Sequence, residues 1–125
     1  MTQQQIIRSI AYGVVFWFIA AMTVHLLPQL FDGGLTNALV LVGSIPVAWL
    51  SIPISLRACG VEPRHALDAN VIAIIAATFA DGVGITFVSD QFYAGVGSAS
   101  QFGAAWILWG VGWILLFAWQ RRDRA

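Results

Sequence analysis

The chain has 125 residues, of which 59% are hydrophobic and only 10% are charged. A soluble domain usually carries about 25% charged residues, so the composition excludes an ordinary soluble domain and favours one compact unit in a membrane. The formal net charge is zero, which gives nucleic acid no electrostatic attraction as a partner. Because Cys59 is the one cysteine, the sequence provides neither an internal disulfide nor a multi-cysteine metal site.

Four long apolar runs predict the fold class, an all-α membrane protein with four transmembrane helices in an antiparallel bundle. A helix needs roughly 20 apolar residues to cross the hydrocarbon core of a bilayer. None of the runs alternates like a barrel strand, and a continuous apolar run in lipid satisfies its backbone hydrogen bonds as a helix. The first run has no small-residue cleavage site, so we expect a retained helix. The spans of this single domain, residues 1–125, are predicted at residues 10–30, 35–56, 66–88 and 101–119.

The basic residues predict how the helices cross the membrane. All six are arginines, and they lie before the first run, in the middle connection and after the last run: Arg8, Arg57, Arg64, Arg121, Arg122 and Arg124. The other two connections contain no basic residue. Cytoplasmic segments of membrane proteins are enriched in Arg and Lys. The pattern therefore predicts a multi-pass protein of the bacterial inner (plasma) membrane with both termini in the cytoplasm.

Two ionisable residues lie inside the predicted spans, His25 in the first and Asp81 in the third. Both spans cross the membrane in the same direction, and both residues lie a little beyond the centre of their span, by roughly 6–8 Å at a rise of about 1.5 Å per residue. The two side chains are therefore expected at one depth. An aspartate at the centre of a span costs about 2.5–3.5 kcal/mol on insertion scales and usually has a partner in the bundle interior.

The pair His25/Asp81 has a functional and a structural interpretation. In the functional one, the pair binds a cation, or a neutral Asp81 releases its proton to His25 and the two titrate as one coupled unit. In the structural one, an interhelical hydrogen bond fixes the packing of the bundle. Small residues on the same helix face favour close approach of another helix. Together with Asn70, they recur at three- and four-residue steps around the aspartate: Ala73, Ala77, Ala80 and Gly84.

The second and fourth spans carry the other candidate site residues. Pro46 lies near mid-membrane and is expected to kink its helix, and a freed carbonyl there, with Ser44 close by, could line a cavity. Trp106 and Trp109 belong to an aromatic stripe, which either packs against helices and lipid or forms a wall for a cation or a flat ligand. We expect Trp106 at the depth of the predicted pair. The candidate proton or ligand site thus contains His25, Ser44, Asp81, Trp106 and Trp109.

Three segments carry a resemblance to a known family: residues 13–19 (GVVFWFI), 79–82 (FADG) and 102–110 (FGAAWILWG). Over nearly its full length the chain resembles a family of small bacterial four-helix membrane proteins, a domain of unknown function. The resemblance implies a four-span inner-membrane protein and brings no established activity. It draws attention to Asp81, because this residue lies inside the second segment.

Two other similarities suggest specific functions. In size and number of spans the chain is similar to the small multidrug-resistance transporters, which carry an essential glutamate in their first helix. The first span here has no acidic residue, so Asp81 would have to replace that glutamate. Residues 21–26 (AMTVHL) are similar to the Ala-x-x-x-His segment of bacterial antenna polypeptides. This similarity implies a chlorin whose magnesium is ligated by His25.

Three functions are open from the sequence. The chain is a non-enzymatic accessory or assembly module without a cofactor, which associates with itself or with a larger membrane complex. Alternatively, it is a small proton-coupled transporter that acts as a homodimer, because four helices enclose only a narrow interior. The third alternative is a pigment or cofactor binder. An enzyme is not expected, since the sequence lacks a cysteine pair, a multi-histidine cluster and a recognisable nucleophile–base arrangement.

Overall fold

A computed structural model describes residues 1–87 and 99–124. This part of the chain forms helices and contains no strand, which confirms the all-α fold class. Within these residues, four helices are long and apolar enough to cross a membrane, as expected for an integral membrane protein. They are α1 (Gln3–Leu26), α2 (Leu35–Cys59), α3 (Ala66–Phe87) and α5 (Ala99–Asp123), with short 3-10 turns η1 (Pro28–Leu30) and η2 (Pro63–His65) between them.

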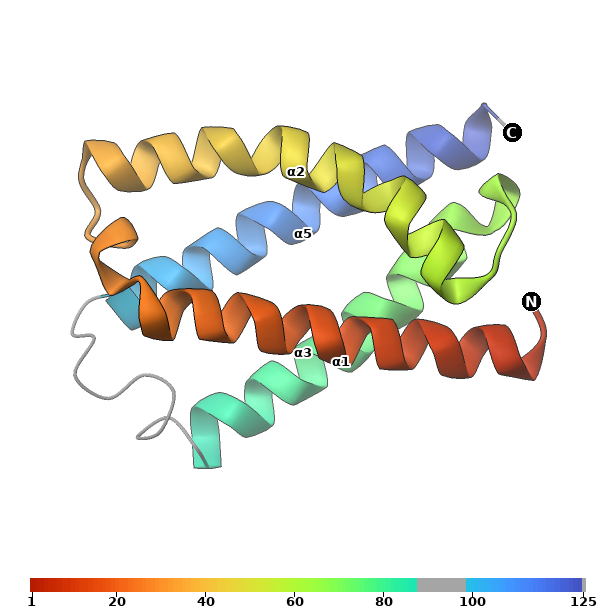
Figure 1. The fold of residues 1–125 in the computed structure, drawn as a ribbon, viewed down its shortest axis with the longest axis horizontal. Coiled ribbons are helices and arrows are strands. Elements are labelled where there is room, and N and C mark those ends of the chain that lie inside the picture. The colour runs from red at the N-terminus through yellow and green to blue at the C-terminus, as the bar shows by residue number, and fades with distance from the viewer. Residues whose placement is uncertain (88–98, 125) are drawn as a thin grey trace.

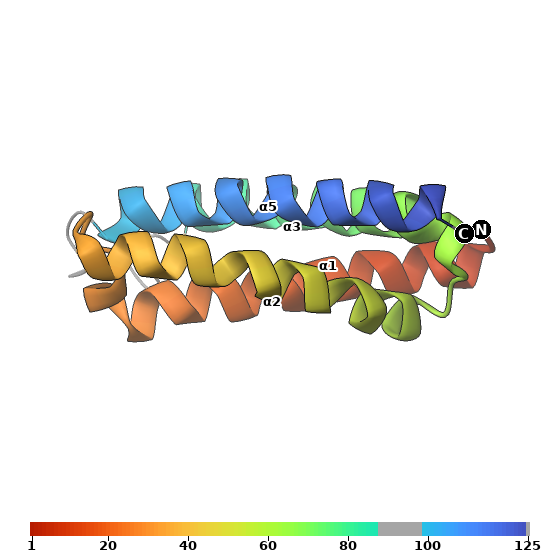
Figure 2. The ribbon, with the colours of Figure 1, turned by 90° about the horizontal axis from the view of Figure 1, so that it is seen from above.

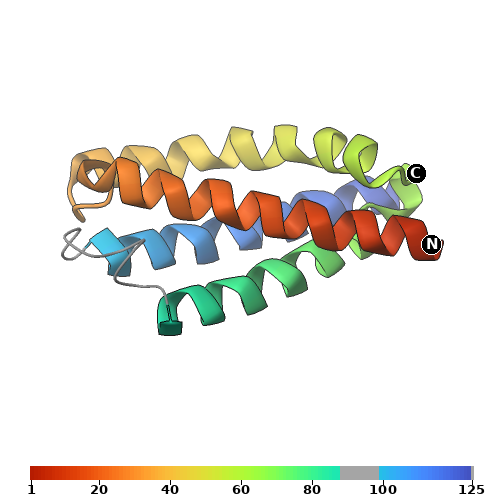
Figure 3. The same cartoon turned by 60° about the horizontal axis from the view of Figure 1, so that its bottom comes forward.

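The four helices form an antiparallel bundle of two layers. Successive helices run in opposite directions (Figure 1), with α1 and α2 in one layer and α3 and α5 in the other (Figure 2). The most extensive contacts join α1 to α3 and α2 to α5. Helix α3 crosses α1 at an angle, and its C-terminal end lies apart from the other three helices (Figures 1 and 3). The candidate site residues are therefore divided between these two pairs of packed helices.

Both termini and the connection between α2 and α3 lie at one end of the bundle (Figure 1). We call it the arginine end, because the six arginines lie on these segments. Arg8 belongs to it too, since its guanidinium lies against Gly60 in that connection. The clustering inferred from the sequence is thus present in three dimensions. The assignment of this end to the cytoplasm stays a prediction.

The first helix differs from its predicted span at both ends. It begins at Gln3 because Thr2 and Gln5 form a capping box: the Gln5 N–H donates to Thr2 Oγ1 at 3.2 Å, and the Thr2 N–H donates to Gln5 Oε1 at 2.8 Å. It ends at Leu26 because a proline disfavours the helical conformation of the residue before it. Leu27, which precedes Pro28, has φ −126° and ψ 52°. The predicted span to residue 30 is therefore divided into α1 and η1.

A glycine turn ends α2 and ties it to α1. Gly60 adopts a left-handed conformation with φ 69°, and the Val61 N–H donates to the Leu56 carbonyl at 3.0 Å. Such a turn satisfies carbonyl groups that the end of a helix leaves without a donor. Gln5 Nε2 on α1 donates to the Gly60 carbonyl at 2.8 Å. The first turn of α1 therefore holds the C-terminal end of α2 in place.

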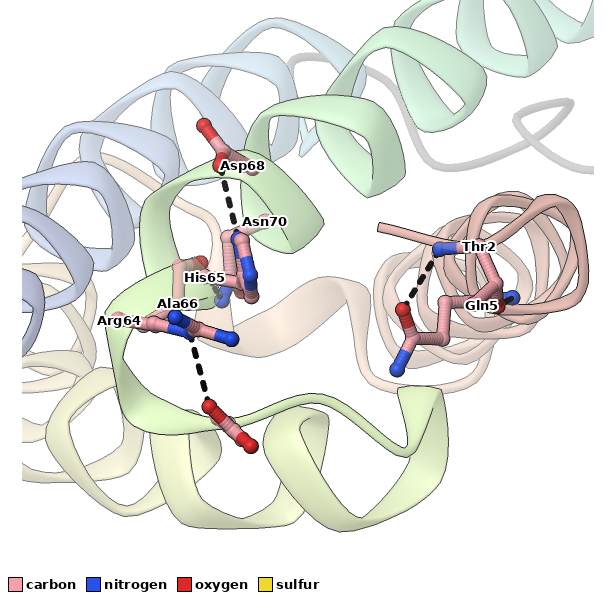
Figure 4. A network of polar contacts seen from close by, with 8 residues as sticks. Thr2, Gln5, Arg64, His65, Ala66, Asp68 and Asn70 are labelled. Carbon is pink, nitrogen blue, oxygen red and sulfur yellow. Dashed lines mark hydrogen bonds and ion pairs between the residues drawn. The ribbon is translucent and has the colours of Figure 1, made fainter.

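Polar contacts at the connection between α2 and α3 are mostly exposed. Arg64 Nε lies 2.8 Å from Glu62 Oε2, and His65 Nδ1 lies 3.4 Å from Asp68 Oδ2 (Figure 4). Exposed ion pairs of this kind contribute about 0–1 kcal/mol to stability. They shape the connection but do not hold the bundle together.

The buried apolar residues form two clusters. The larger one lies toward the arginine end and contains Ala48, Ile52, Leu56, Cys59, Val61, Ala66, Ala69, Ile114 and Ala118. The smaller one lies toward the other end, where Val24 and Phe31 pack with Trp106. Many large apolar side chains point outward instead, including Phe79 with 75% and Leu108 with 74% of its surface exposed. An outer surface of this kind fits lipid rather than water.

Candidate functional site

Two of the five predicted site residues are in direct contact. Trp106 on α5 donates from Nε1 to Ser44 Oγ on α2 at 2.7 Å. The Ser44 hydroxyl in turn donates to the Val40 carbonyl one turn earlier, also at 2.7 Å. The Trp106 ring packs on Phe31 with a centroid distance of 5.1 Å. Trp106 and Ser44 therefore form part of the α2–α5 interface, next to the smaller core cluster.

Trp109, the next residue of the predicted stripe, also bonds to α2. Its Nε1 donates to the Leu41 carbonyl at 2.9 Å. This carbonyl lies in the helical turn before Pro46, one residue before the Val42 carbonyl, which the proline leaves without its helical donor. Trp106 and Trp109 thus hold α2 on either side of the same turn. This part of the aromatic stripe packs against a neighbouring helix, which agrees with its structural interpretation.

Asp81 lies at the interface between α1 and α3. Trp17 Nε1 donates to Asp81 Oδ1 at 3.1 Å, and both side chains are half-buried. One turn of α3 further on, Gly84 is buried under the same indole ring: a Cβ atom there would lie 2.8 Å from Trp17 Cζ2. The absence of a side chain at Gly84 therefore makes room for the ring that donates to Asp81.

His25 is half-buried in the last turn of α1. It follows Trp17, the partner of Asp81, by eight residues, which corresponds to about 12 Å along the helix axis. Toward this end α3 diverges from α1 (Figure 1). The neighbouring residue Val24 packs in the cluster that contains Trp106. The pairing of His25 with Asp81 stays a prediction.

A buried amide outside the predicted site joins α2 to α3. Asn70 is 3% exposed, and its Nδ2 donates to Ser55 Oγ at 3.0 Å and to the Ala66 carbonyl at 2.8 Å. Ser55 precedes Glu62 in the connection by seven residues and Asn70 follows it by eight. Residues at similar distances from the turn of a helical hairpin lie opposite each other, so this spacing was a signal that could have identified the pair.

The interhelical hydrogen bonds have a common chemical character. In residues 1–87 and 99–124 they connect indole, hydroxyl, amide and carbonyl groups between helices, and they include the carboxyl group of Asp81. Among the described residues, every buried side-chain nitrogen or oxygen has a hydrogen-bond partner. No three His, Cys, Asp or Glu side chains come together as a metal-binding group in residues 1–87 and 99–124. The arrangement fastens the helices to one another.

Comparisons of the chain with protein-family models, with curated proteins and with solved structures give no match. The resemblance to small bacterial four-helix proteins therefore stays a prediction. Any functional conclusion rests on the residues and contacts of this chain itself.

Proposed function

We propose that this integral membrane protein is a non-enzymatic accessory or assembly module of a bacterial inner membrane. The observation that carries the proposal is that polar side chains of different helices form hydrogen bonds with one another. Three contacts join polar side chains of different helices in the described bundle: Trp17–Asp81, Trp106–Ser44 and Asn70–Ser55. Groups that satisfy one another in this way specify how helices pack. Many large apolar side chains are exposed on the outer surface, which suits lipid or the helices of another membrane protein.

The arginine end supports a cytoplasmic location of both termini. The arginine-bearing segments lie together at this end (Figure 1). Positively charged segments are retained on the cytoplasmic side during insertion. Fusion of a fluorescent protein to the C-terminus tests the assignment, because this reporter fluoresces when it folds in the cytoplasm. A dark fusion, together with an active periplasmic phosphatase reporter at the same position, would reverse the orientation.

Transport is the second candidate, and the energetics of Asp81 favour it. Interhelical hydrogen bonds in membrane proteins contribute about 0.6 kcal/mol on average and at most about 1.7 kcal/mol. An aspartate at the centre of a span costs about 2.5–3.5 kcal/mol on insertion scales. The hydrogen bond to Trp17 thus stabilises the protein by less than the aspartate costs, which favours a second role of the carboxyl group. A proton-coupled transporter that works as a homodimer would use Asp81 to carry the proton.

The variant Asp81→Asn separates the two proposals. Asparagine keeps an oxygen that accepts from Trp17 Nε1, but it has no proton to exchange. If the chain is an accessory module, the variant assembles in its native membrane in the wild-type amount. If the chain is a transporter, proton-coupled solute flux in liposomes is lost in the variant.

Trp17→Phe is the matched control. It removes the indole donor and leaves the Asp81 carboxyl group in place. An accessory module is impaired more by Trp17→Phe than by Asp81→Asn, whereas a transporter shows the reverse order. Measurable proton flux in wild-type liposomes, lost in Asp81→Asn and kept in Trp17→Phe, would replace the accessory proposal by transport.

A further inference from the structure

Two shallow grooves open at the arginine end, the first between α2 and α5 and the second between α2, the connection that follows it and α5. The first has a cavity volume of about 180 Å³, and its lining includes Trp49, Pro53, Phe117, Arg121 and Arg124. The second, of about 330 Å³, shares Pro53 and Arg121 and continues to Arg57. Because they share two residues, we treat them as one surface, the α2–α5 groove. Its groove arginines are Arg57, Arg121 and Arg124.

Polarity changes along the α2–α5 groove in a regular way. On α2, Trp49, Pro53 and Arg57 follow one another at four-residue steps and so share one helix face. On α5, Phe117 precedes Arg121 by four residues. In both helices the arginine lies nearer the arginine end than the apolar residue does. From Trp49 to Arg57 the helix rises by about 12 Å. A phospholipid has the same order, an acyl chain followed by a phosphate group.

The charge of the groove is not balanced by nearby acids. Neither of its two parts has an acidic residue in its lining. The groove arginines form no ion pair with any acid in the described part of the chain, whereas Arg64 pairs with Glu62 at 2.8 Å and Arg122 pairs with Asp123 at 3.5 Å. Their guanidinium groups are therefore available to an external anion.

We propose that the α2–α5 groove binds one anionic phospholipid. The phosphate contacts the groove arginines, because guanidinium groups form paired hydrogen bonds with phosphate oxygens. An acyl chain lies along Trp49 and Phe117. The proposal rests on the groove alone, so it holds whether the chain is an accessory module or a transporter.

The test measures lipid binding to the purified protein in a non-ionic detergent by native mass spectrometry. Dioleoylphosphatidylglycerol and dioleoylphosphatidylcholine are added separately, since they share acyl chains and differ in headgroup charge. We expect the wild-type protein to retain one phosphatidylglycerol in preference to phosphatidylcholine. Because an arginine near a membrane surface adds about 1 kcal/mol of attraction to anionic lipid, Arg121→Gln should weaken phosphatidylglycerol binding about fivefold.

Arg64→Gln is the matched control, because it removes the same charge at the same end of the bundle but outside the groove. It should leave phosphatidylglycerol binding unchanged. An equal loss in Arg64→Gln and Arg121→Gln would show a general attraction to basic residues and overturn the proposal. Equal retention of the two lipids by the wild-type protein would overturn it as well.

Two further measurements keep the result interpretable. If Arg121→Gln folds poorly, Arg124→Gln replaces it, because Arg124 is exposed near the end of α5. Glycerol 3-phosphate, which has the anionic group without acyl chains, should not displace the lipid at equal concentration. Displacement by glycerol 3-phosphate would show that the apolar part of the groove takes no part in binding and would contradict the proposal.

Discussion

Gly13 marks a place where the backbones of α1 and α3 touch. A Cβ atom at this position would lie 2.7 Å from the carbonyl carbon and 2.8 Å from the Cα atom of Ala73, closer than real Cβ atoms come to other atoms. These neighbours are backbone atoms, so no flexible side chain can move aside. The substitution Gly13→Ala therefore forces the two helices apart, and we expect it to destabilise the protein.

Gly43 provides the matched control for this substitution. It also lies inside a helix, and its Cβ position has no atom within 4 Å. Both substitutions gain the helix propensity of alanine, about 0.5–1 kcal/mol. This gain cancels when the free energies of unfolding of the two variants are compared. The difference that remains is the cost of overpacking at Gly13, which typically amounts to about 1–3 kcal/mol. A central value of about 2 kcal/mol corresponds to a roughly 30-fold change in the unfolding constant.

The assay is reversible unfolding by sodium dodecyl sulfate in mixed micelles, followed by far-ultraviolet circular dichroism. We expect Gly43→Ala to unfold at the wild-type fraction of sodium dodecyl sulfate or slightly above it. Gly13→Ala should unfold at a clearly lower fraction. If the two variants have the same free energy of unfolding, the α1–α3 contact at Gly13 does not exist as described.

The other predictions use the same titration. Asn70→Ala removes the hydrogen bond that joins α3 to Ser55 and should lower the free energy of unfolding by about 0.6–1.7 kcal/mol; an unchanged value would refute the buried pair. Ser44→Ala and Trp106→Phe, combined in a double-mutant cycle, should show a coupling energy of about 0.6 kcal/mol. Additive effects of these two substitutions would show that their hydrogen bond contributes nothing to stability.

Much of the fold could be predicted because hydropathy is a local property. The four apolar runs correspond to four long helices in the described part of the chain, and the segments that carry the arginines lie at one end of the bundle. The sequence also indicates the early start of α1, since Thr2 and Gln5 have the spacing of a capping box. Its end at Leu26 follows from Pro28. Both features are polar or conformational signals that a search for apolar residues overlooks.

The candidate site could be predicted only in part, because helix pairing and tilt depend on packing between distant segments. Ser44 and Trp106 were both proposed as site residues, and the structure adds the hydrogen bond between them. The partner of Asp81 could not be predicted from the sequence. The Trp17–Asp81 contact depends on where α1 and α3 cross. The two helices touch at Gly13, and Gly84 has no side chain that would block the Trp17 ring, so the ring reaches the carboxyl group. The membrane depth of a residue, estimated from its position in its own helix, does not show where two helices cross.

As an accessory or assembly module, the chain is expected to work as a part of a larger membrane assembly. The most direct measurement is extraction of the chain from its native membrane into polymer-bounded lipid discs, followed by determination of the mass and protein composition of the particles. We expect a particle that contains the chain and at least one other membrane protein in a fixed ratio. Particles that contain only one or two copies of this chain would contradict it.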